Sequence, residues 1–248
     1  MDLMVKNKVI PKLWLVGAGP GDPELITMKG FNVLKKASVV LYDNLANEKL
    51  LNIVSDSCLR IYVGKKPYGN YVSQEEINQM IKNYAYKYKE VVRLKGGDPF
   101  IFGRGFEEMV YARENGIDAE YVPGISSMQG AGINGIPLTH RGVCEGFWVV
   151  TGTKTDRSLS LDLKLAMKSN ATVVVYMGMK KLDEISEVYI SGGKGNIPAA
   201  IIQHATLKNQ KMVIGEVRNL KVMADQKMLT YPAIIVIGKT VGLNSVVV

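Results

Sequence analysis

The sequence predicts an α/β protein of two lobes, and three observations carry this prediction. Eight short runs are rich in Val, Ile and Leu without strict alternation, as expected of strands that are buried on both faces. Helical patterns lie between many of these runs, which favours largely parallel sheets. A segment rich in glycine and proline, 122–142, interrupts the middle of the chain. We therefore expect an N-terminal α/β lobe at 1–137 and a C-terminal α/β lobe at 138–248, with an active-site cleft between them.

The predicted strands are divided about equally between the two lobes. They are the runs 13–17, 38–42, 59–63, 91–94, 147–150, 172–176, 199–202 and 233–237. The clearest helix begins after Ser73, which forms a capping-box pattern with Glu76. Apolar and aromatic side chains then recur on one helical face, at Ile77, Met80, Ile81, Tyr84 and Tyr88.

Composition bounds the class of protein. The chain has 248 residues, 47% of them hydrophobic, so it can bury a core without covalent cross-links. Its two cysteines, Cys58 and Cys144, show no CxxC spacing, which argues against a disulfide framework or a metal site and favours a reducing cytoplasm. The apolar run 13–18 is too short for a signal core or a membrane span, so we expect a cytoplasmic protein without a membrane partner.

The formal net charge of +8 predicts an attraction for anions. The basic residues are spread along the chain, and the aromatic residues do not alternate with them. Both features argue against a dedicated nucleic-acid surface. A small polyanionic metabolite fits the charge better.

The first candidate loop follows the first predicted strand, with the sequence Gly-Ala-Gly-Pro-Gly-Asp-Pro at 17–23. Asp22 is a good helix N-cap, and Pro23 suits the first helical position. A dinucleotide-binding fingerprint would need glycine where Asp22 stands, and this carboxylate would repel a pyrophosphate. A simple capped turn remains the alternative interpretation of this fragment.

The second candidate loop, within 93–105, also ends a strand in Gly-Asp-Pro. Gly96 and Gly97 present backbone with no side chain in the way, and Asp98 offers a carboxylate to hydroxyl, amino or cationic groups. Such a loop suits an uncharged or cationic ligand better than a phosphate. S-adenosylmethionine, with its sulfonium, ammonium and ribose hydroxyls, has that character.

With these motifs the chain resembles the tetrapyrrole methylase family, from about residue 13 to residue 238. The stretches that carry the resemblance are 16–27, 40–45, 62–66, 73–78, 93–105, 121–127, 135–141 and 176–179. The sequence GGDPFIFGRG at 96–105 is highly specific in combination with the others. The sequence GIPLTHR at 135–141 is similar to the members that methylate uroporphyrinogen III.

The resemblance implies a two-lobed homodimer that holds S-adenosylmethionine between its lobes. It implies methylation of uroporphyrinogen III at two ring carbons to give precorrin-2, which feeds sirohaem or cobalamin synthesis. Matching positions imply Asp43 as the proton acceptor and Lys65 as the proton donor. They place Arg104, Glu107 and Arg141 near the tetrapyrrole. The implied cofactor contacts are Pro20, Gly96, Gly97, Asp98, Ile101, Ser126, Ser127, Met177 and Ala205.

Departures from the family pattern at Phe106, Ser126, Ser127 and Ala205, and several alternatives, accompany this interpretation. Phe106 stands where the family often has glycine, so the substrate pocket is expected to differ in shape. A later corrinoid methyltransferase would share fold and cofactor, and an RNA or protein methyltransferase would share the glycine loops. Outside this class, the alternatives are a dinucleotide-dependent oxidoreductase and a non-enzymatic anion-binding module.

Overall fold

The computed structural model describes residues 9–64 and 72–246, and its contacts form two compact units, Met1–Ser126 and Ser127–Val248. The sequence-based boundary at 137/138 lies further along the chain. Helix α4 (Gly130–Ile133) packs within the second unit, where Ala131 and Ile136 are fully buried in one core cluster.

The first unit contains a five-stranded sheet in which every pairing is parallel, with the order β3-β2-β4-β1-β5. The strands are β1 (Lys12–Gly17), β2 (Val39–Tyr42), β3 (Leu59–Tyr62), β4 (Glu90–Lys95) and β5 (Asp118–Val122). In the inner strand β1, Leu13 lies opposite Val91 of β4 on one side and Ala119 of β5 on the other.

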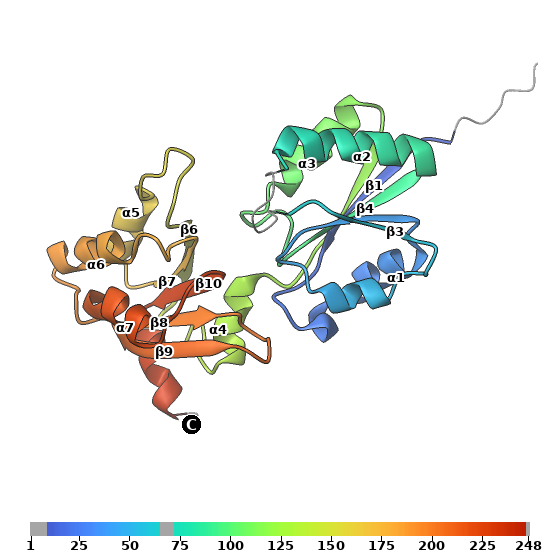
Figure 1. Cartoon of the computed structure of the whole chain (residues 1–248). Helices are drawn as coiled ribbons and strands as arrows, with labels where there is room; N and C mark the ends of the chain where they lie inside the picture. The colour runs from blue at the N-terminus through green and yellow to red at the C-terminus, as the bar shows by residue number, and fades with distance from the viewer. Residues whose placement is uncertain (1–8, 65–71, 247–248) are drawn as a thin grey trace, which may run out of the picture. The chain divides into compact units, whose positions relative to one another are not determined.

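Helices cover both faces of this sheet (Figure 1). Side chains alternate along β1, so Leu13 and Leu15 belong to one buried cluster while Val16 belongs to another. The first cluster packs under α2 (Gln74–Tyr88) and α3 (Gly105–Glu114), and the second under α1 (Met28–Lys36). Because both faces are covered, the inner strands are mostly apolar, and Arg93 and Lys95 of β4 are buried polar exceptions.

The predicted capping box of α2 is present. The Ser73 hydroxyl accepts a hydrogen bond from the backbone N–H of Glu76 at 3.2 Å, and the Glu76 carboxylate accepts one from the backbone N–H of Ser73 at 2.6 Å. Asp22 is an N-cap as well, but it caps a single 3₁₀ turn, Pro23–Leu25, and α1 begins later with Thr27 as its own cap.

The second unit contains a mixed sheet with the order β6-β7-β10-β8-β9. The strands are β6 (Phe147–Thr151), β7 (Thr172–Tyr176), β8 (Pro198–Gln203), β9 (Lys211–Glu216) and β10 (Ala233–Ile237). Only β6 and β7 pair in parallel, and β10 runs antiparallel to both β7 and β8. The α/β fold class is therefore confirmed, whereas largely parallel pairing holds for the first sheet alone.

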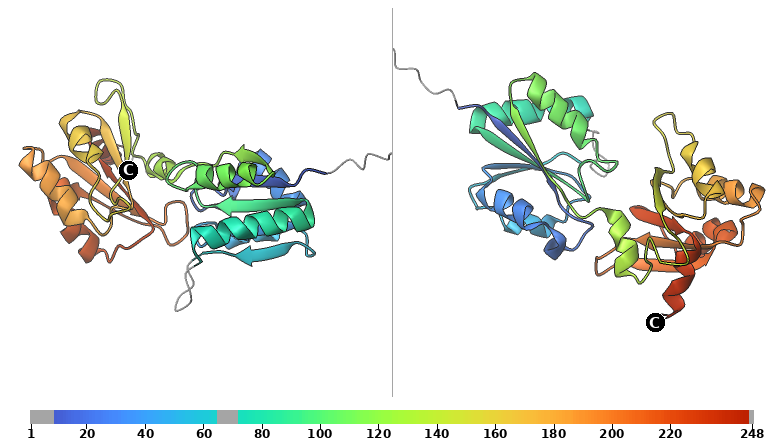
Figure 2. Two further views of the ribbon diagram at one scale, coloured as in Figure 1. Left: turned by 90° about the horizontal axis from the view of Figure 1, so that it is seen from above. Right: turned by 180° about the vertical axis from the view of Figure 1, so that it is seen from behind.

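Two layers cover the second sheet (Figure 2). The helices α5 (Asp162–Lys168), α6 (Leu182–Ser191) and α7 (Leu220–Gln226) bury one face. The other face packs against α4 and Val241, a residue of the 3₁₀ segment Lys239–Val246. In the part of the chain that the structure describes, no helix is both long and apolar enough to cross a membrane.

Candidate active site

Four loops that include predicted site residues or neighbour them gather at one edge of the first sheet, because its strands are all parallel. The carboxyl ends of parallel strands lie along one edge, which is the usual ligand edge of open α/β sheets. The loop 18–22 follows β1, Asp43 follows β2, the Gly96–Gly97 pair follows β4, and Pro123 and Gly124 follow β5.

Glycines join three of these loops through direct backbone contact. Gly19 and Gly97 form an isolated antiparallel bridge, with N···O distances of 3.3 and 2.7 Å. A Cβ atom at Gly124 would lie 2.2 Å from the carbonyl oxygen of Gly97 and 2.7 Å from Cα of Gly17. These contacts require residues without side chains, and Gly97 also adopts φ +67°, which favours glycine.

Asp98 ties the loop after β4 to the end of β5. Its Oδ1 atom accepts a hydrogen bond from the backbone N–H of Phe100 at 2.8 Å. Its Oδ2 atom accepts from the Gly124 N–H at 3.0 Å and from the Tyr121 hydroxyl. Desolvation and then the bond to Asp98 raise the pKa of Tyr121. The sequence predicts that the Asp98 carboxylate offers hydrogen bonds to a ligand. In the structure Asp98 is 5% exposed, and its carboxylate accepts these hydrogen bonds from the protein itself.

The remaining predicted cofactor residues of the first unit lie in the same loops. Pro20 follows Gly19 and is half-buried, as are Gly96 and Ile101. The backbone N–H of Ile101 donates to the carbonyl of Asp98 at 3.2 Å, which closes a turn. Ser126, two residues after Gly124, is 3% exposed.

Asp43 stands at the end of β2 with both carboxylate oxygens engaged. Oδ1 accepts a hydrogen bond from the backbone N–H of Leu45 at 3.1 Å, which stabilises a turn. Oδ2 accepts from Nη2 of Arg93 at 2.9 Å. The side chain is 19% exposed, so Asp43 is held in place and still reaches the surface of this edge.

A buried ionic cluster lies behind Asp43, and the sequence analysis did not identify it. The fully buried Glu108 of α3 contacts Arg93 at 3.4 Å and Lys95 at 2.9 Å, and both cations belong to β4. Burial and then repulsion from Arg93 lower the pKa of Lys95, while Glu108 opposes that shift. Pairing is required, because an unpaired buried charge is strongly unfavourable.

The predicted substrate residues of the first unit lie at the start of α3. Arg104 precedes the helix with φ +59°, and its Nε and Nη2 atoms donate to the same oxygen of Glu107, Nε at 3.0 Å. This pairing lowers the pKa of Glu107. Phe106 is 61% exposed and meets Phe100 edge to face with the ring centroids 5.9 Å apart. An aromatic surface therefore lies beside a cation at this helix terminus.

In the second unit, the predicted cofactor residues follow strand ends at a single edge. The strands β7 and β8 are both antiparallel to β10 and hence parallel to each other, so Met177 and Ala205 follow the same edge of this sheet. Met177 has φ +54° and is 52% exposed. Ser127 lies near this edge, because the backbone N–H of its neighbour Met128 donates to the Tyr176 hydroxyl at 2.8 Å.

The two remaining predicted residues are Arg141 and Lys65. Arg141 is exposed in the second unit, and its carbonyl oxygen lies 2.8 Å from Nδ1 of His140. Lys65, the predicted proton donor, lies outside the described residues. Within the described ranges, no group of three or more His, Cys, Asp or Glu side chains could hold a metal ion.

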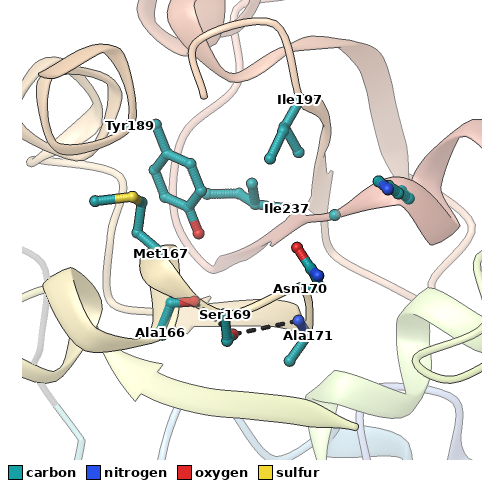
Figure 3. A pocket seen from close by; sticks show the side chains of 10 residues that line it. Ala166, Met167, Ser169, Asn170, Ala171, Tyr189, Ile197 and Ile237 are labelled. Carbon is teal, nitrogen blue, oxygen red and sulfur yellow. Dashed lines mark hydrogen bonds between the residues drawn. The ribbon is translucent and has the colours of Figure 1, made fainter. Parts of the chain in front are cut away.

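A small pocket in the second unit does not coincide with these residues (Figure 3). It adjoins Ala171, just before β7, and Gly238, just after β10, so it lies at the sheet edge opposite Met177 and Ala205. The Tyr189 side chain is buried in its wall, and desolvation raises the Tyr189 pKa. The lining residues are Ala166, Met167, Ser169, Asn170, Ala171, Tyr189, Ile197, Ile237, Gly238 and Lys239.

Known sequences and families match nearly the whole chain. A family model described as Tetrapyrrole (Corrin/Porphyrin) Methylases matches residues 12–221. A uroporphyrinogen-III C-methyltransferase of Bacillus subtilis is 43% identical over 98% of this chain and 50% of its own length. A siroheme synthase of Chromobacterium violaceum is 41% identical over 93% of this chain and 50% of its own length. The chain thus spans about half the length of these curated relatives.

Solved structures of similar length also match. The uroporphyrin-III C-methyl transferase of Thermus thermophilus, complexed with S-adenyl homocysteine, has a TM-score of 0.81 at 36% identity. The match covers 94% of this chain and 99% of that one. A cobalt precorrin-4 methyltransferase of cobalamin biosynthesis has a TM-score of 0.83 at 26% identity, covering 97% of this chain and 99% of that one.

Proposed function

Since this chain belongs to the tetrapyrrole methylase family, we propose that it uses S-adenosylmethionine to methylate uroporphyrinogen III at two ring carbons, giving precorrin-2. The observation that carries the proposal is the contact of Gly17, Gly97 and Gly124, which brings three loops into direct backbone contact at the carboxyl edge of the first sheet. The relatives that methylate uroporphyrinogen III or make sirohaem support the choice of substrate.

The residues around these loops fit a cationic, hydroxyl-rich methyl donor. The predicted contacts include glycines, small hydroxyl residues and Met177, whose backbone has φ +54°, and none of the predicted contacts is a cation that would repel a sulfonium. Asp98 supports the donor indirectly, because its hydrogen bonds to the Phe100 and Gly124 N–H groups fix the two loops. S-adenosylmethionine supplies an electrophilic methyl carbon, whose bond to sulfur breaks as sulfur takes the electron pair.

The protein then needs to position the macrocycle and to handle protons. A reduced tetrapyrrole carbon is itself the nucleophile, so correct placement of the two ligands supplies much of the rate enhancement, up to roughly 7–11 kcal/mol in favourable cases. Asp43 accepts the proton that the methylated macrocycle releases, and the electron pair of the bond to that proton stays with the macrocycle. Lys65 is proposed as the complementary proton donor.

Charge complementarity supports a polyanionic substrate. Uroporphyrinogen III carries eight carboxylates, and arginine can bind a carboxylate through two parallel hydrogen bonds. We assign this contact to Arg104 and Arg141, with Glu107 orienting Arg104 through the hydrogen bonds that it accepts. The exposed ring of Phe106 is proposed to shape the pocket on the same side of α3.

Anaerobic product analysis tests the proposal. The purified protein is mixed with S-adenosylmethionine and enzymatically made uroporphyrinogen III, and the product is weighed by mass spectrometry. We expect a gain of two methyl groups. A mass gain with a later corrinoid intermediate but not with uroporphyrinogen III would contradict the proposed substrate, and the family assignment would stand. Sedimentation of the same preparation tests the proposed homodimer, for which a monomer mass would be the contrary result.

A further inference from the structure

Glu108 is a fully buried carboxylate that the proposed chemistry leaves without a role. Its Oε1 atom accepts hydrogen bonds from Nε2 of Gln74 at 3.0 Å, from Nζ of Lys95 at 2.9 Å and from Nε of Arg93 at 3.4 Å. Among the described residues, its Oε2 atom has no hydrogen-bond partner. A buried carboxylate with one unsatisfied oxygen is unfavourable for folding alone, and such groups often mark functional sites.

The cluster balances two anions against two cations. Asp43 and Glu108 are the carboxylates, and Arg93 and Lys95 are the cations, both nine-tenths or more buried. Buried ion pairs contribute little net stability compared with well-packed apolar side chains, because desolvation offsets their attraction. What such a cluster does supply is a fixed geometry for each charged group.

The Arg93 guanidinium carries this geometry from Glu108 to Asp43. Its Nε faces Glu108, and its Nη2 donates to Oδ2 of Asp43 at 2.9 Å. Its third nitrogen, Nη1, donates to the carbonyl of Leu94 at 2.9 Å. With all three nitrogens engaged, the planar group has one orientation, and the position of the Asp43 carboxylate follows from it.

We propose that Glu108 is a positioning residue of the active site, which fixes Arg93 so that Arg93 holds the Asp43 carboxylate in the orientation that accepts the substrate proton. The proposal rests on the proposed function in one respect, since the proton-acceptor role of Asp43 belongs to that function. Glu108 itself touches no substrate. It acts through Arg93 on Asp43, so the proposal can be tested by measuring whether the effects of substituting Glu108 and Asp43 are additive.

A double-mutant cycle on the full-length protein provides the test. Glu108→Gln is expected to lower kcat by about 10- to 100-fold, as small misplacements of catalytic groups do, while the KM for S-adenosylmethionine stays within about twofold of the wild type. Combined with Asp43→Asn, the same substitution is expected to have no further effect. Glu120→Gln is the matched control, because Glu120 also pairs with two lysines, Lys12 and Lys29, outside this cluster.

The outcomes separate positioning from mere support of the fold. Additive losses in the double variant, or a wild-type kcat in a folded Glu108→Gln protein, would overturn the proposal. If Glu108→Gln does not fold, Glu108→Asp keeps the charge while shortening its reach and enters the same cycle with the same expectation. Single-turnover measurements with excess enzyme keep the slow Asp43→Asn variants measurable.

A crystal structure of the Glu108→Gln protein gives a readout that needs no activity. We expect the distance from Arg93 Nη2 to Asp43 Oδ2 to exceed about 3.5 Å, the limit of a useful hydrogen bond. An unchanged distance would contradict the positioning role. If the wild-type protein methylates no uroporphyrinogen III, the proposed function fails, and this structure still decides whether Glu108 positions Asp43.

Discussion

At the scale of single residues, the Asp98 carboxylate links two loops of the candidate site. Its carboxylate accepts bonds from the Phe100 and Gly124 N–H groups and from the Tyr121 hydroxyl. Each hydrogen bond to a buried charge contributes roughly 1.5–3 kcal/mol. We therefore expect Asp98→Ala to lower the free energy of unfolding by about 2–4 kcal/mol and to weaken S-adenosylmethionine binding in the fraction that remains folded.

Denaturant unfolding and calorimetry measure the two effects of the Asp98 substitution. Asp118→Ala is a suitable control, because Asp118 forms a partly exposed ion pair with Lys12 at 3.5 Å, and such pairs contribute about 0–1 kcal/mol. Unchanged stability together with unchanged cofactor affinity would show that the Asp98 hydrogen bonds hold neither the fold nor the site.

The two predicted substrate arginines give a second prediction at this scale. Arg104→Lys and Arg141→Lys each keep the charge and lose the planar fork, so one charge-assisted hydrogen bond is lost. We expect kcat/KM for uroporphyrinogen III to fall by about one to two orders of magnitude, while cofactor affinity stays near that of the wild type. Steady-state kinetics of the folded variants measure this, and wild-type values in both would leave the Arg104–Glu107 pair a purely structural contact.

At the scale of elements, the meeting of three loops depends on glycine backbone. A Cβ atom on Gly124 would lie 2.2 Å from a carbonyl oxygen, and backbone has no rotamer that relieves such a contact. Gly124→Ala is therefore expected to cost about 2–4 kcal/mol of stability and to weaken S-adenosylmethionine binding. Gly132→Ala is the matched control, because the new Cβ would meet no described atom within 4 Å apart from its chain neighbours and the backbone of its own helix. Equal losses in both variants would contradict the argument.

The strands show what hydrophobic pattern predicts and what it misses. All eight predicted runs are strands, but β5 and β9 were not predicted. Both lie at a sheet edge, where one side of a strand lacks a neighbour, and partly or fully exposed residues make up three of the five in β5 and all six in β9. Polar residues at such positions interrupt the apolar runs that identify inner strands, so the sequence DAEYV of β5 resembles a loop.

Some residues of the candidate site could be predicted from the sequence, and others could not. Glycine and aspartate after a strand are visible in the sequence, so the loops around Gly97 and the position of Asp43 could be predicted. Glu108 could not, since an acidic residue in the first turn of a helix is usually explained by the helix dipole and by solvent. Its partners Arg93 and Lys95 are two residues apart on β4, so the alternation of side chains along a strand places both on the face that α3 covers. Two cations on one buried strand face are the signal in the sequence that could have indicated a buried anion.

At the scale of the whole molecule, the surplus of positive charge governs how a polyanion approaches. The first unit holds 17 Lys and Arg against 15 Asp and Glu, and the second holds 14 against 8, so most of the net charge of +8 belongs to the second unit. The basic residues form no single block of sequence, so the surplus acts as a long-range field rather than as a single contact. The field of exposed charges is screened over about 10 Å at 0.1 M salt and about 3 Å at 1 M. Short contacts such as the Arg104–Glu107 pair are affected less than the approach of the substrate.

Salt should therefore act on one substrate and not on the other. We expect kcat/KM for uroporphyrinogen III, with its eight carboxylates, to fall steadily as sodium chloride rises, because screening slows the steered encounter. The KM for S-adenosylmethionine, which carries a sulfonium and an ammonium, should not rise in parallel, since a basic protein does not attract that ligand through its net charge. Initial rates measured anaerobically across a salt series, with one ligand saturating at a time, separate the two responses. If kcat/KM for uroporphyrinogen III does not change with salt, or if both ligands lose equally, the positive surplus does not guide the substrate. Local contacts such as those of Arg104 and Arg141 would then account for its recognition.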